Sequence, residues 1–73
     1  MTIEHIAAEL ARNNKAEQEA IEGYFRLIDD TAHAGLPKEF FDDIREIISD
    51  EMNHSEVLSK WVTRFTGIKP AAT

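Results

Sequence analysis

The sequence predicts an all-α protein: an antiparallel hairpin of two long helices, which pairs with a second hairpin to complete a four-helix bundle. Apolar residues recur at helical spacing over two stretches of about thirty residues each. A single short segment containing Gly35 and Pro37 separates the two stretches. The chain has only 73 residues, and a domain of this size buries so little surface that a partner subunit is expected.

The first helix is predicted over about residues 2–34. Thr2 is a suitable N-cap, and Gly35 followed by Pro37 is a typical stop signal, because glycine tolerates the left-handed terminal conformation and proline is suited to open the next helix. The apolar residues in phase along this stretch are Ile3, Ile6, Leu10, Ala20, Ile21, Tyr24, Leu27 and Ile28.

The second helix is predicted over about residues 37–65, and Gly67 and Pro70 end it. The loop between the helices is too short for anything but an antiparallel hairpin. Residues 1–66 are therefore predicted to form one helical domain, and 67–73 a short tail. The residues in phase are Phe41, Ile44, Ile48, Leu58, Val62 and Phe65.

Composition restricts the partners. The net charge of -6 argues against a nucleic-acid partner and against an anionic membrane surface. No apolar run is long enough to span a membrane, and the N-terminus does not resemble a signal peptide, so a cytoplasmic protein is expected. With no cysteine in the chain, any metal must be held by carboxylates and imidazoles.

Polar residues interrupt both apolar stripes. Steps of three and four from Phe41 place Glu51 on the seam, the line of residues that faces the other helix, with His54 beside it. The same count from Ile3 places Asn13 and Glu17 on the seam of the first helix. An ionised carboxylate buried there without a partner costs several kcal/mol, so it is expected to be protonated, paired or bound to a cation.

Helix geometry predicts that these residues meet. Glu17 lies 18 residues from Gly35, whereas Glu51 and His54 lie 16 and 19 residues from it. At ~1.5 Å per residue these separations correspond to ~27, ~24 and ~28 Å along the hairpin. Two paired hairpins would bring together two free glutamates and two Glu-x-x-His pairs, the ligand set that bundles use for two iron or manganese ions. A rotated first helix would present Glu19 or Glu22 in place of Glu17.

Two motifs carry a resemblance to a known family. The segment from Glu17 to Tyr24 resembles the Glu-x-x-Ala-x-x-x-Tyr signature of ferritin-like and rubrerythrin-like proteins. The segment from Asp50 to His54, with Leu58, looks like their Asp-Glu-x-x-His-x-x-x-Leu helix. Because the chain carries half a bundle, it is most similar to the encapsulated ferritins, and the resemblance covers roughly residues 10–62.

This resemblance implies a di-iron ferroxidase whose site is assembled between two subunits. If the matching residues have the roles they have in that family, Glu17, Glu51 and His54 would be both the metal ligands and the catalytic residues. Tyr24 would lie close to them. It also implies oxidation of Fe(II) for iron storage or detoxification, a homodimer or larger ring of dimers, and an encapsulin shell as the surrounding compartment.

Two other hypotheses remain open. The chain could be a metal-free hairpin that acts as a dimerisation or assembly module, with Glu51 and His54 in a polar network that specifies register. It could also be a rubrerythrin-like di-iron protein that reduces peroxide. In the metal-free case, Tyr24 is an ordinary core aromatic.

Overall fold

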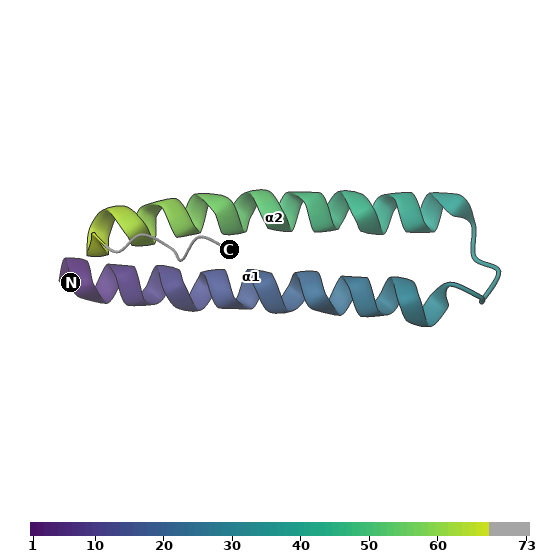
Figure 1. The fold of residues 1–73 in the computed structure, drawn as a ribbon, viewed down its shortest axis with the longest axis horizontal. Helices are drawn as coiled ribbons and strands as arrows, with labels where there is room; N and C mark the ends of the chain where they lie inside the picture. The colour runs from purple at the N-terminus through teal and green to yellow at the C-terminus, as the bar shows by residue number, and fades with distance from the viewer. Residues whose placement is uncertain (68–73) are drawn as a thin grey trace.

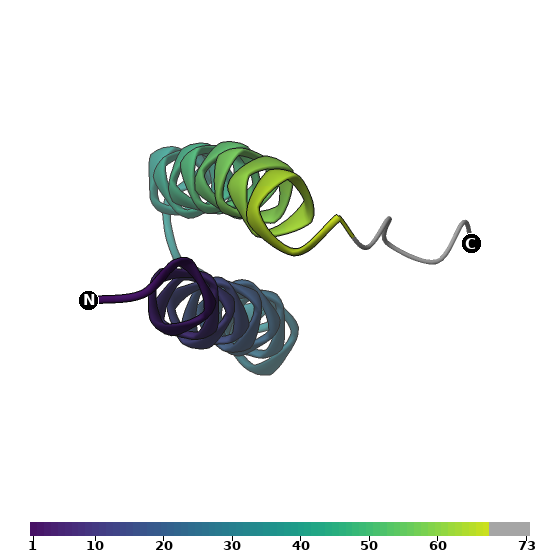
Figure 2. The same ribbon diagram turned by 90° about the vertical axis from the view of Figure 1, so that its left-hand side faces the viewer.

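The computed structural model describes residues 1–67, which form two helices, α1 (Ile3–Thr31) and α2 (Lys38–Thr66) (Figure 1). A short turn joins them, and they run antiparallel side by side in both views (Figures 1 and 2). The predicted all-α helical hairpin is therefore confirmed. No helix among the described residues is both long enough and apolar enough to cross a membrane.

The first helix starts as predicted and ends earlier. The hydroxyl oxygen of Thr2 accepts a hydrogen bond from the His5 amide at 3.1 Å, which is the N-cap interaction. The helix ends at Thr31 rather than near residue 34, because residues 32–35 form a turn in which the Ala34 amide donates to the Thr31 carbonyl at 3.0 Å. Gly35 completes the turn with φ +73°, a conformation that glycine adopts without strain.

The second helix matches its predicted bounds to within one residue. Pro37 stands at the N-cap position with φ -59°, and the helix begins at Lys38. It ends at Thr66, and Gly67 follows in the left-handed conformation, with φ 69° and its amide donating to the Thr63 carbonyl at 2.8 Å. Of the predicted tail, residues 68–73 lie outside the described part of the chain.

The two helices form a single layer with little interior (Figure 2). Within residues 1–67, only Ala7 and Ile48 are buried. A helix normally buries its apolar stripe against another element. Much of the apolar surface is instead exposed here, including Ile3, Phe25, Leu27, Leu36, Ile47, Met52, Val57, Trp61 and Phe65.

The seam of α1 differs by one position from the prediction. Asn14 is half-buried on the seam and Asn13 is exposed, whereas Ile3 and Leu27, both expected on the seam, are 56% and 37% exposed. The sequence supports two neighbouring stripes, because apolar residues stand next to each other at Ile6 and Ala7, at Ala20 and Ile21, and at Leu27 and Ile28. Packing against α2 buries Ala7 more than Ile6 and Ile28 more than Leu27, while Ala20 and Ile21 are both half-buried.

Candidate metal centre

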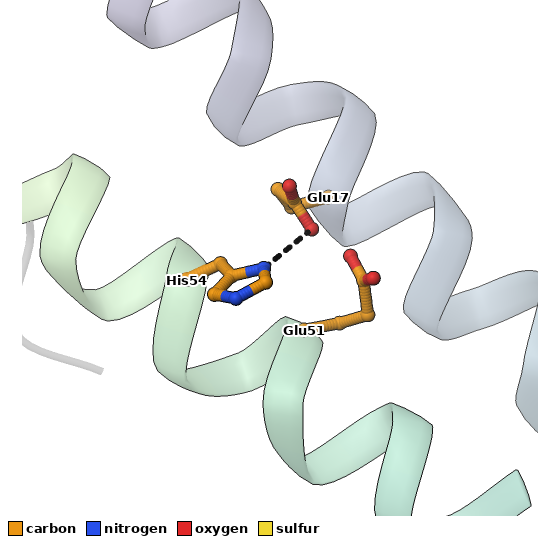
Figure 3. A group of neighbouring side chains, drawn as sticks. All are labelled: Glu17, Glu51 and His54. Carbon is orange, nitrogen blue, oxygen red and sulfur yellow. Dashed lines mark ion pairs between the residues drawn. The ribbon is translucent and has the colours of Figure 1, made fainter.

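Three side chains that the sequence singled out converge between the helices. Glu17 projects from α1, while Glu51 and His54 project from α2, and all three point toward one another (Figure 3). One ligand atom from each lies within 4.8 Å of the other two. The structure therefore brings together the three predicted residues as a compact group of two carboxylates and one imidazole.

Local helix geometry explains this convergence. Glu51 and His54 are three residues apart on α2, so their side chains project from the same part of the helix surface. Glu17 reaches the same level because α1 and α2 each have 29 residues and are joined by a short turn. A constant rise per residue then places positions equally distant from the turn opposite each other.

The carboxylate of Glu17 is incompletely satisfied. Its Oε2 is buried and accepts no hydrogen bond from any group within residues 1–67. The nearest cationic candidate is Nδ1 of His54 at 3.8 Å, which is too far for a hydrogen bond. A buried acceptor without a partner typically costs about 1–3 kcal/mol. A cation held between these side chains would offset that cost, so the residues fit a metal site.

The group is open to one side of the hairpin. The side chain of Glu17 is 25% exposed and that of His54 is 60% exposed. A shallow groove of about 290 Å³ adjoins them, and Val57 and Leu58 complete its lining. An apolar groove wall beside the ligand-type atoms is a surface that a further protein element could cover.

Tyr24, Glu19 and Glu22 lie outside this group. Tyr24 is half-buried and seven residues beyond Glu17, about 10 Å along the helix axis. Glu19 and Glu22 are exposed, so α1 contributes Glu17 to the group, and the rotated arrangement that would present either alternative is not the one observed.

One set of polar residues between the helices was not predicted from the sequence. Asn14 of α1 exchanges hydrogen bonds with Ser55 and Ser59 of α2, one turn away from Glu17. The signal that could have identified Asn14 is its spacing of seven residues from Ala7 and Ile21, which puts it on the same stripe.

The donor set determines which cations the group suits. Carboxylates are hard ligands that can bridge two cations, and imidazole is a nitrogen ligand suited to iron and other transition metals. One hairpin supplies three such side chains, fewer than the six or so donors of an octahedral site. A second hairpin would double the number.

In three separate comparisons, no family model, no characterised protein and no solved structure matched the chain. The ferritin-like assignment therefore stays a prediction that rests on the motif residues.

Proposed function

We propose that the protein is a ferroxidase of the ferritin-like type, which oxidises Fe(II) at a di-iron site shared between two copies of the chain. The single observation that carries the proposal is the convergence of Glu17, Glu51 and His54 within 4.8 Å, with one carboxylate oxygen of Glu17 buried and unpaired among the described residues. The experiment that tests it is iron addition followed by native mass measurement.

The uncovered surface around the site supports a second copy as the partner. Residues seven apart on a helix share one stripe, so Ile47, His54 and Trp61 lie along one flank of α2. Ile47 and Trp61 are each 37% exposed, on either side of the candidate ligand. A partner that covers this flank would bury the apolar pair and enclose the imidazole in the same step.

Charge balance is met in a doubled site. Two copies would supply four carboxylates from Glu17 and Glu51, which offset the four positive charges of two ferrous ions. They would also supply two imidazoles from His54, one for each metal ion. A lone hairpin offers two carboxylates, which match the charge of a single divalent cation.

The reaction needs only an external oxidant. Each Fe(II) loses one electron, so two ferrous ions reduce one dioxygen, with two protons, to hydrogen peroxide. Alternatively, they reduce one hydrogen peroxide, with two protons, to two waters. Glu17 and Glu51 would bind and orient the ferrous substrate, and their negative charge favours the more highly charged ferric product. His54 would complete the donor set from the same face of α2.

The biological setting follows from the motif resemblance. Ferric product from a ferroxidase must be stored, so we propose iron storage or detoxification as the role. The resemblance to encapsulated ferritins suggests a ring of dimers within an encapsulin shell. Manganese remains a second candidate for the bound metal, because the same hard donors accept it.

Iron addition to the purified protein tests the proposal. We expect Fe(II), added without oxygen, to shift the native mass toward an even number of chains carrying two metal ions per pair. Admission of air should then produce a ferric absorbance rise. If the assembly is the same with and without Fe(II), and no absorbance appears in air, the metal-free assembly module is the better description. The uncovered apolar surface also fits that function.

Glu17 and Glu22 provide a matched pair on α1. We expect Glu17→Gln to weaken Co(II) binding by more than about tenfold, because it removes a ligand charge from the group. Glu22→Gln removes the same charge from an exposed position and should leave the affinity unchanged within twofold or so. Cobalt absorption titrations measure both. Equal effects would show that the first helix binds metal in a different rotation.

A further inference from the structure

A polar bridge joins the two helices one turn from the candidate metal centre. The hydroxyl of Ser55 donates to Oδ1 of Asn14 at 2.5 Å, and Nδ2 of Asn14 donates to the hydroxyl of Ser59 at 3.0 Å. All three side chains are half-buried. The amide of Asn14 thus spans two successive turns of α2, using its acceptor for one serine and its donor for the other.

The bridge distinguishes between two rotations of α1 that apolar packing would both allow. Neighbouring apolar pairs such as Ile6 with Ala7 and Ala20 with Ile21 let either of two stripes face α2. Hydrophobic attraction is not directional, so it discriminates weakly between them. Hydrogen bonds are directional, and in this rotation the amide of Asn14 lies between the two serines.

The rotation of α1 decides how its side chains lie relative to the metal centre. Glu17 lies three residues after Asn14, on the same side of α1. On α2, Ser55 follows His54 directly and lies four residues after Glu51. Glu17 belongs to both stripes, so turning α1 from one stripe to the other would move Glu17 across the seam and change the direction in which its carboxylate faces Glu51 and His54.

We infer that Asn14, Ser55 and Ser59 form a positioning clamp, which sets the rotation and axial level of α1 so that Glu17 faces Glu51 and His54. The clamp is a property of the metal-free hairpin. Only its effect on metal affinity rests on the proposed function. Polar residues at single seam positions fix register in this way in coiled coils, at some expense in stability.

The test replaces the clamp by apolar groups. In the variant Asn14→Leu/Ser55→Ala/Ser59→Ala no partner is left unpaired, so its melting temperature should be unchanged or higher. Because the chain has no cysteine, spin labels can be placed specifically at Lys15→Cys and Glu56→Cys, which are exposed positions on the two helices. Labelled chains diluted in unlabelled chains then report distances within one hairpin.

We expect one narrow distance distribution for the native clamp and a shifted or broadened one for the variant, both without metal. Co(II) affinity should fall by about tenfold or more, although the melting temperature does not fall. A purely stabilising bridge cannot produce that combination. The matched control Ser49→Ala/Asn53→Leu makes the same types of change at exposed positions of α2 and should alter neither measurement.

An unchanged distance distribution in the variant overturns the clamp, whatever happens to its melting temperature or Co(II) affinity. If the triple variant does not fold, Asn14→Ala in the same labelled background gives the deciding distribution. Absence of Co(II) binding by the native chain would contradict the proposed function instead. The distances between labels would still decide the role of Asn14 in that case.

Discussion

Glu51→Ala is expected to abolish the proposed oxidation of Fe(II) in air, followed as ferric absorbance. In a shared site the substitution removes two of four carboxylates, so two ferrous ions would carry two uncompensated positive charges in a partly buried place. Loss of a residue that merely orients a ligand costs about 10- to 100-fold in affinity, and loss of the ligand itself should exceed that. Initial rates of absorbance change at a fixed iron concentration provide the measurement.

His54→Ala should have a similar effect, because each metal ion would lose its nitrogen ligand. Glu56→Ala is the control, since Glu56 is exposed on the same helix and outside the cluster of ligand-type atoms. It should keep the native rate. In the absence of metal, Glu51→Ala should leave the melting temperature unchanged or raise it, because a half-buried charge is removed. A native rate in Glu51→Ala would refute the assignment of this site.

Ile47→Lys is expected to dissociate the proposed pair of hairpins. Ile47 lies on the flank of α2 that also carries His54 and Trp61, and we propose that this flank is covered by the second copy. A lysine placed in such an interface costs ~2 kcal/mol or more, and a symmetric dimer contains it twice. A loss of ~4 kcal/mol corresponds to a dissociation constant raised about a thousandfold. Sedimentation over a range of concentrations would measure the change.

Met52→Lys is the matched control for this experiment. Met52 is 48% exposed, and it lies five residues from Ile47, about 140° around the helix. The substitution Met52→Lys should therefore leave the dimer intact and the rate of iron oxidation at its native value. If Met52→Lys dissociates the dimer and Ile47→Lys does not, the second copy covers the opposite face. The metal site would then have to be completed in some other way.

Much of the fold and the site could be predicted from the sequence. Helical periodicity over two long stretches, with Gly35 and Pro37 between them, determines a hairpin, because each local preference supports the same arrangement. Because a helix rises by a constant amount per residue, the number of residues between a position and the turn gives its place along the hairpin axis. This is why Glu17 could be placed level with Glu51 and His54 by counting residues.

The rotation of α1 was decided only by the tertiary structure. The sequence has apolar residues on two neighbouring stripes, and counting in steps of three and four placed Asn13 on the seam where the structure has Asn14. An ideal helix drifts by ~20° per heptad from a repeat of seven, so a count over 29 residues leaves the facing side open. The directional hydrogen bonds between Asn14 and two serines of α2, in which Ser55 donates to Asn14 and Asn14 donates to Ser59, exist only once the helices have packed. They accompany the rotation that leaves Glu17 with an unpaired buried oxygen among the described residues.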